Sequence, residues 1–238
     1  MNPALVPAAI VAGTALSYLA AIAIGIPWLV PILNVAPAFP FMVAALRRGQ
    51  VGDAIWRMLV WAAALAVCAT ALSYFWTAEA GRLFIRGEAY RREMFEFVDT
   101  GRGAEGNIRA FLPQHLLHGS VFCALAIATG SALAMPLGAF LMNYMAYYVG
   151  ALGAASTQPW KAMPLAWVPW AVIRIASFVT LGVVLAGPVL SRVLRFPYRL
   201  ADHRRWIWLA LGGLVADVVM KWALAPWWRE MIRAAAGW

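Results

Sequence analysis

Two long stretches of the sequence carry no charged side chain, and they constrain the fold more than any other feature. No Asp, Glu, Lys or Arg precedes Arg47, and none lies between Arg109 and Lys161. A helix over residues 1–46 would be about 69 Å long at about 1.5 Å per residue, enough to cross a hydrocarbon core about 30 Å thick twice. The stretches therefore predict an all-α integral membrane protein built as a polytopic helical bundle.

Composition excludes the ordinary soluble classes. Hydrophobic residues make up 64% of the chain and charged residues 12%, whereas a soluble domain has about 25% charged residues. The net charge of +9 comes from short arginine clusters between apolar runs, so nucleic acid is not an expected partner. We expect a single transmembrane domain over residues 1–238, with the lipid bilayer as its main partner.

Seven membrane spans are predicted from apolar runs flanked by tryptophan or arginine. They lie near 4–24, 28–46, 58–78, 111–131, 135–153, 164–187 and 206–226. The second contains several prolines, which remove backbone donors and kink or break a helix. The alternative is that this segment re-enters from one side, which leaves six spans.

The distribution of arginine predicts the orientation. Loops 47–57 and 191–205 carry an excess of arginine, which favours the cytoplasmic side, whereas the charges in 79–109 cancel. Seven alternating spans place both arginine-rich loops on one side and 79–109 on the other. We therefore expect a multi-pass protein of the plasma (inner) membrane with a cytoplasmic N-terminus. A re-entrant 28–46 would move the N-terminus outside.

The loop 79–109 contains an amphipathic pattern. Tyr90, Met94 and Phe97 recur at helical spacing among arginine and glutamate residues, which predicts an interfacial helix. Such a helix either lies on the membrane surface or caps the bundle.

Three residues of the Asp, Glu, Lys and Arg types fall within the predicted spans. Asp217 and Lys221 are four residues apart in the last span, and Arg174 lies near the middle of the sixth. Such groups are expensive at membrane depth unless paired or hydrated, and an acid four residues before a base favours a pair. We predict a polar centre in which Asp217 neutralises one cation and the other binds a substrate or ion. The competing interpretation is a buried ion pair that only fixes helix register.

Asn34 is a further candidate for binding a substrate or ion. It lies between Pro31 and Pro37, and broken helices expose backbone groups that line cavities in transporters. The competing interpretation is a kink whose freed carbonyls are satisfied by neighbouring helices.

The segment FLPQHLLHG places His115 and His118 on one face of the fourth span, near its outer end. Glu105 in the preceding loop would complete a catalytic or metal site, since imidazoles one turn apart bind metals and transfer protons. The spacing is not that of the zinc-protease helix, and no nucleophile elbow, P-loop or dinucleotide fingerprint occurs in the sequence. No cofactor is predicted, and a metal at the two histidines is kept only as an alternative.

Small residues recur every four positions along the first span, at Gly13, Ser17, Ala21 and Gly25. This spacing lets two helices approach closely. The contact is expected within the chain, in a homo-oligomer or with another membrane subunit.

Two hypotheses for the function follow. The first is a small permease-type transporter or a membrane subunit of a transport or assembly complex, which fits the broken helix and the membrane-depth charges. The second is a membrane-embedded enzyme that acts on a lipid or lipid-linked substrate at the outer leaflet through His115 and His118. The missing enzyme motifs favour the first.

Overall fold

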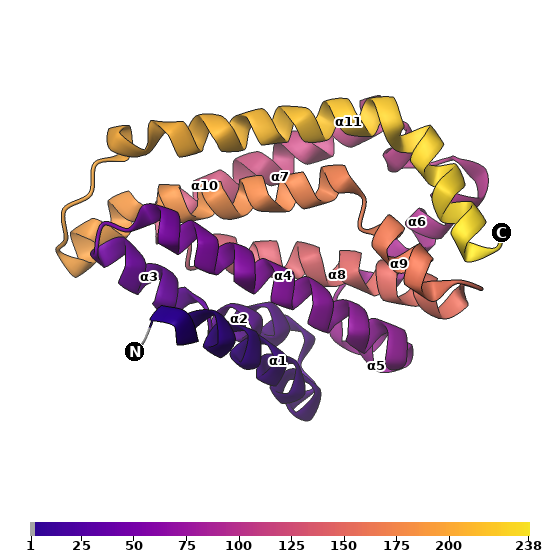
Figure 1. The fold of residues 1–238 in the computed structure, drawn as a ribbon, viewed down its shortest axis with the longest axis horizontal. Helices are drawn as coiled ribbons and strands as arrows, with labels where there is room; N and C mark the ends of the chain where they lie inside the picture. Colours follow the sequence, from indigo (N-terminus) through magenta and orange to yellow (C-terminus); the bar gives the residue numbers. More distant parts are fainter. Residues whose placement is uncertain (1–2) are drawn as a thin grey trace.

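A computed structural model describes residues 3–238 of the chain (Figure 1). Within these residues the regular structure is helical throughout, and no strand forms. Six helical segments are long and apolar enough to cross a membrane. They are α1 (Val6–Ile24), Pro27–Arg47, α4 (Val51–Phe75), α7 (Ile108–Thr129), α10 (Pro169–Leu194) and Leu200–Ala236, which contains α11 (Arg204–Ala236). The prediction of an all-helical chain is confirmed, and membrane-crossing helices are supported by length and composition.

The proline-rich second segment is broken, as its sequence predicts. It comprises the 3-10 helix η2 (Pro27–Leu29), α2 (Val30–Val35) and α3 (Phe39–Arg47), with a short turn between the two α-helices. Pro31 and Pro40 lie in the first turns of α2 and α3, where a proline removes no intrahelical hydrogen bond. The prolines therefore begin separate short helices instead of kinking one continuous helix.

Helix α8 (Ala134–Ala155) corresponds to the predicted span 135–153, but it is less apolar than the six segments and is not among them. It packs against α4, α6, α2 and α9, and residues 145–153 are all buried. Gly150 permits the closest contact, because a Cβ atom there would lie 2.4 Å from the Cβ of Ser73 on α4. α8 is therefore an inner helix that the others surround.

The predicted span 164–187 differs from the structure at both ends. The chain forms α9 (Pro159–Ala166), breaks, and resumes as α10, which continues to Leu194. The break occurs because Val168 precedes Pro169 and adopts an extended conformation with ψ 140°, and a residue before proline disfavours the helical region. Arg174 is therefore near the start of its helix, not near the middle.

Two other helices are longer than predicted. α4 begins at Val51 instead of residue 58, since the buried Arg57 lies inside it and pairs with Asp53 at 2.6 Å. Arg57 also donates a hydrogen bond to the Phe41 carbonyl at 3.0 Å. α11 continues through Pro226 to Ala236, beyond the predicted end at residue 226.

The segment between α4 and α7 contains α5 (Thr77–Leu83), α6 (Gly87–Thr100) and the 3-10 helix η3 (Ala104–Gly106). The predicted amphipathic helix is α6, and it packs against α8 with Met94 and Phe97 buried. Its apolar face is therefore covered by protein, so α6 caps the other helices. This is one of the two placements that the sequence left open.

The connections gather at two ends of the molecule. Figure 1 shows the α3–α4 turn and the α10–α11 connection, which includes the 3-10 helix η4 (Leu200–His203), at the same end as the N-terminus. The helices α5 and α6 and the C-terminus lie at the opposite end. The two arginine-rich loops, 47–57 and 191–205, thus lie at the same end of the molecule. Seven alternating spans would also place them on one side of a membrane.

The small residues of α1 contact the chain itself. A Cβ atom at Gly13 would lie 2.6 Å from the Cβ of Pro37, and Ser17 accepts a hydrogen bond from Asn34 at 2.9 Å. Ala21 is buried as well, and Gly25 ends the helix with a φ of 69°. The stripe therefore packs α1 against the broken second segment.

Candidate functional site

Five ionisable side chains from four elements meet near the end of the molecule that carries α6. We call this group the ionic cluster, and its members are Glu105 on η3, His115 on α7, Arg174 on α10, and Asp217 and Lys221 on α11. The sequence placed these residues in two separate candidate sites. The structure brings both sites together.

Asp217 is the most confined member of the ionic cluster. It is fully buried, and neither carboxylate oxygen has a hydrogen-bond partner among the described residues. Its nearest charged or titratable neighbours are His115, with Nδ1 at 3.5 Å, and Arg174, with Nη1 at 3.7 Å. A carboxylate is usually hydrogen-bonded when it is buried, so this one is under-satisfied.

The backbone of α11 comes close to α10 beside this aspartate. A Cβ atom at Gly213 would lie 2.2 Å from the Ser177 hydroxyl oxygen, so only glycine fits there without a shift. Gly213 is one turn before Asp217, and the close approach brings the Asp217 carboxylate toward Arg174. The contact between α10 and α11 thus depends on a small residue, Gly213, and on the short side chain of Asp217, which share one face of α11.

Lys221 does not form the expected pair with Asp217. Its Nζ atom lies 2.8 Å from Glu105 Oε1 and 3.4 Å from the centre of the Phe111 ring. Both residues of α11 share a helical face, but the long lysine side chain reaches η3, and the short aspartate side chain remains beside α10. The cation that Asp217 faces is therefore Arg174, with His115 beside it, and Lys221 faces Glu105 instead.

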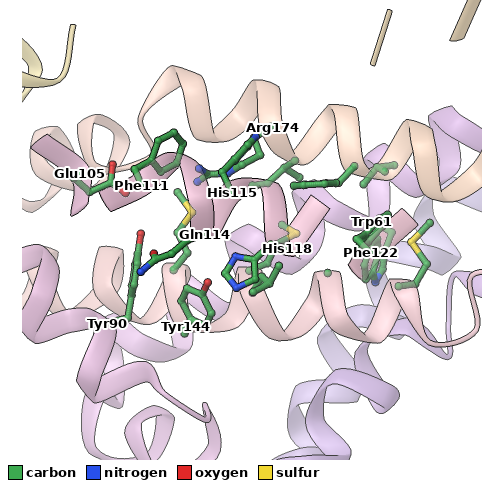
Figure 2. Close-up of a pocket in the computed structure, with 18 residues that line it drawn as sticks. Trp61, Tyr90, Glu105, Phe111, Gln114, His115, His118, Phe122, Tyr144 and Arg174 are labelled. Atoms are coloured by element: carbon green, nitrogen blue, oxygen red, sulfur yellow. The ribbon is translucent and has the colours of Figure 1, made fainter. Parts of the chain in front are cut away.

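A cavity of about 140 Å³ adjoins the ionic cluster, lined mainly by α7, α8 and α10. Polar side chains line one end, and Figure 2 shows Tyr90 and Glu105 there. Apolar side chains line the other end, where Figure 2 shows Trp61 and Phe122. The cavity is therefore amphiphilic along its length.

Arg174 is the only member of the ionic cluster that brings a permanent positive charge to this cavity. It lines the cavity, and its side chain is 20% exposed. Within residues 3–238 its guanidinium forms no hydrogen bond, the closest carboxylate oxygen being that of Asp217 at 3.7 Å. A guanidinium has five N–H donors, so Arg174 retains donors for an anionic ligand.

The predicted histidine site lies in the same cavity. His115, His118 and Glu105 all line it, and His118 is exposed at its polar end. His115 is almost fully buried between the rings of Phe111 and Phe178, with ring centres at 5.1 and 6.2 Å. No three His, Cys, Asp or Glu side chains in the described part of the chain are grouped so as to hold a metal ion.

Asn34 lies outside the ionic cluster and outside the cavity. It donates a hydrogen bond to Ser17 and accepts one from Asn143, both at 2.9 Å, and Asn143 accepts one from Tyr18 at 2.6 Å. The indole of Trp61 donates to the Asn34 carbonyl at 2.7 Å. We call these residues the Asn34 network. It joins α1, α2, α4 and α8 and satisfies the backbone of the broken segment.

Sequence reasoning missed that one face of α7 lines a cavity. Phe111, His115, His118 and Phe122 follow one face of α7 at spacings of three and four residues, and all four line the cavity. This helical spacing was the sequence pattern from which the cavity-lining face of α7 could have been predicted. It is ambiguous in a membrane helix, because an apolar residue that faces lipid resembles one that faces a cavity.

Comparisons with protein-family models, with curated proteins and with solved structures found no match. The site itself consists of a partly free arginine, an under-satisfied aspartate and an amphiphilic cavity between them and α8.

Proposed function

We propose that the chain is a permease-type membrane protein whose cavity binds a small anionic amphiphile. The single observation that carries this proposal is the cavity itself, with Arg174 at its polar end and aromatic and aliphatic side chains beyond it. A charged group that lines a cavity at membrane depth marks a substrate or ion site by default. An anionic head bound at Arg174 would leave its hydrocarbon part against Phe122 and Phe178.

The volume limits the size of the ligand. An apolar cavity of about 150 Å³ admits benzene, and the cavity here is about 140 Å³. It therefore suits a carboxylate with a short chain or a single ring, and not a two-chain lipid. Hexanoate is a suitable probe because its head and tail match the two ends.

The direct test compares two glycine substitutions. Gly138 lines the cavity and a Cβ atom there meets only Phe122, at 3.5 Å, so Gly138→Leu should fill the cavity without disturbing α8. Gly212 is exposed on α11 with no atom within 4 Å, so Gly212→Leu is the matched control. The assay measures tritiated hexanoate binding to protein in lipid nanodiscs by scintillation proximity.

The proposal expects saturable hexanoate binding by the wild type and by Gly212→Leu, and loss of binding by Gly138→Leu. Acetate, which lacks the tail, and hexanol, which lacks the charge, should compete poorly. Saturable binding of phosphatidylglycerol without saturable binding of hexanoate by the wild type would assign the site to a lipid instead. Equal binding by both glycine variants would place hexanoate outside the cavity and contradict the proposal.

The topology that accompanies this proposal has seven spans, with α8 as the seventh. Its 22 residues would extend about 33 Å at about 1.5 Å per residue, enough for a crossing. Seven crossings with the arginine-rich loops inside place the N-terminus in the cytoplasm and the polar end of the cavity outside. Cysteines introduced at the exposed Gln50 and at the exposed Glu96 should react with a membrane-impermeant maleimide from opposite sides of the plasma membrane.

A membrane-embedded enzyme remains the second candidate, because His115, His118 and Glu105 share the cavity. The lining includes no serine, threonine or cysteine that would serve as a nucleophile. Hydrolysis there would need general base catalysis on water by a histidine. Hexanoate binding that survives His118→Gln, without turnover of short-chain esters by the wild type, would favour the permease-type function.

A further inference from the structure

Asp217 has an arrangement that ion pairing alone does not explain. It is fully buried, neither of its oxygens has a hydrogen-bond partner within residues 3–238, and it lies behind the cavity instead of lining it. An ionised carboxylate in such a place is stabilised only if neighbouring charges compensate for lost hydration. The ionised form of Asp217 therefore depends on the charges that surround it.

The charged and titratable groups around Asp217 come from each element packed against it. On α10 it faces Arg174, on α7 it faces His115, and its own helix contributes Lys221. Further out lie Glu105 on η3, His118 on α7, Tyr90 on α6 and Tyr144 on α8. Lys221 is engaged by Glu105 at 2.8 Å. Arg174 is therefore the cation on which ionised Asp217 depends.

Arg174 also lines the cavity, so Asp217 and a bound anion compete for its guanidinium. Its guanidinium is 3.7 Å from Asp217, beyond hydrogen-bonding distance, and it lines the cavity. An anion that forms charge-assisted hydrogen bonds to Arg174 would draw the arginine into those shorter contacts. The carboxylate of Asp217 would then be left buried without a counterion.

We propose that Asp217 is a proton-binding site that takes up a proton when an anionic ligand binds Arg174. The inference rests on the proposed function, since it requires an anion in the cavity. One O–H bond forms between a solvent proton and a carboxylate oxygen, no other bond changes, and the site gains no net charge. The ligand and the proton thus bind together.

His115 gives the proton a route to Asp217. The aspartate does not line the cavity, but His115 does, and its Nδ1 atom is 3.5 Å from Asp217 Oδ2. His118 is exposed at the polar end of the same cavity, one turn away on α7. Imidazole nitrogens accept and donate protons near neutral pH, so the two histidines connect solvent to the buried carboxyl group.

The test measures proton uptake and hexanoate binding on the same sample. Wild-type protein in nanodiscs, weakly buffered with a pH-indicator dye, receives hexanoate adjusted to the same pH. We expect about one proton taken up per hexanoate bound, and an affinity that rises about tenfold per pH unit lowered while free Asp217 is ionised. Gly138→Leu protein supplies the blank for protonation of the ligand itself.

Substitution of the aspartate separates the proton site from the ligand site. Asp217→Asn should bind hexanoate with no proton uptake and no pH dependence, whereas Asp202→Asn, at an exposed aspartate, should behave as the wild type. In infrared difference spectra, hexanoate should raise the protonated-carboxyl C=O band in the wild type and not in Asp217→Asn. If Asp217→Asn does not fold, Asp217→Glu should keep proton uptake and shift the band.

Hexanoate binding by the wild type without proton uptake would overturn the proton site and leave the proposed function standing. Equal proton uptake by the wild type and Asp217→Asn would also overturn it. Absence of hexanoate binding by the wild type would contradict the proposed function, and the proton site with it.

Discussion

The two polar regions inside this molecule are built from similar helices and differ in how completely their polar atoms are satisfied. In the Asn34 network, the side chains of Asn34 and Asn143 form hydrogen bonds at 2.6–2.9 Å. In the ionic cluster, the nearest charged or titratable neighbours of Asp217 lie at 3.5 and 3.7 Å, and in the described part of the chain neither of its oxygens has a hydrogen-bond partner. The Asn34 and Asn143 side chains are therefore satisfied by protein partners, whereas the ionic cluster retains unused hydrogen-bonding capacity.

This difference distinguishes polar groups that only hold the helices together from polar groups that remain available to a ligand. A fully satisfied buried network fixes one arrangement of the helices and offers nothing to a ligand. A buried charge that lacks its partners destabilises the resting state, and a ligand or proton can relieve that cost. Among the described residues, three members of the ionic cluster line the cavity, whereas the Asn34 network contributes only Trp61, whose indole N–H is already bonded to the Asn34 carbonyl.

The largest expected effect is on ligand binding when the arginine is neutralised. Arg174→Gln should weaken hexanoate binding by about 10- to 100-fold, since hydrogen bonds to charged groups contribute about 1.5–3 kcal/mol. Arg192→Gln, at an exposed position near the end of the same helix, is the control and should bind as the wild type. Scintillation proximity in nanodiscs measures both. Weaker binding by Arg192→Gln alone would assign the anion to the other end of the molecule.

The next effect is on stability and concerns the Asn34 network. Asn34→Leu should lower the free energy of unfolding by about 1–3 kcal/mol, because the buried Asn143 amide nitrogen loses its acceptor and the Ser17 hydroxyl oxygen loses the hydrogen bond that it accepts. Hexanoate affinity should not change. Thermal unfolding in detergent checks the first point, and the double variant Asn34→Leu/Asn143→Leu should cost less than the sum of the single variants. Additive costs would show that the two side chains act independently.

A smaller stability effect is expected at the aspartate. Asp217→Asn removes a charge but no hydrogen bond, so it should change the unfolding free energy by less than about 1 kcal/mol, whereas loss of a satisfied buried partner costs about 1–3 kcal/mol. The same thermal assay compares it with Asn34→Leu. A larger loss for Asp217→Asn than for Asn34→Leu would make the ion pair structural and remove the contrast between the two regions.

The smallest effect concerns the contact between α6 and α8 that Glu88 and Tyr147 form. The hydrogen bond donated by the Tyr147 hydroxyl lowers the pKa of Glu88 below its ordinary value. The contact therefore stabilises the fold above the ordinary glutamate pKa, and its contribution is lost as the pH falls through the lowered pKa. Glu88→Gln should remove this acid dependence from the melting temperature, whereas Glu96→Gln, exposed on the same helix, should keep it. Identical pH profiles for both variants would contradict the assignment.

Most of the helices could be predicted from the sequence because hydropathy is a local property. The charge-free runs located α1, α7 and α8 to within a few residues. The boundaries of α4 and α10 were less accurate for physical reasons that involve partners. Arg57 is compatible with a buried helix only because Asp53 and a carbonyl on α3 satisfy it.

The candidate site was predicted only in parts. The sequence identified the unusual residues, since a charge or a histidine in an apolar run is conspicuous, but it assigned them to two sites. The spacing of Asp217 and Lys221 shows that they share a face, and it does not show that Glu105 comes closer to the lysine. Tertiary packing decides which partner is nearest, and no single-sequence pattern contains that distance.

The most direct test of the central claim locates the bound amphiphile. A hexanoate analogue with a photoactivatable diazirine at its tail is bound to wild-type protein in nanodiscs, irradiated, and the labelled residues are mapped by mass spectrometry. We predict labels on α7 and α8 at Phe122 and Leu141, which line the apolar end of the cavity, and loss of these labels in Gly138→Leu. Labels on exposed faces such as Trp222 of α11, unchanged in Gly138→Leu, would contradict the account.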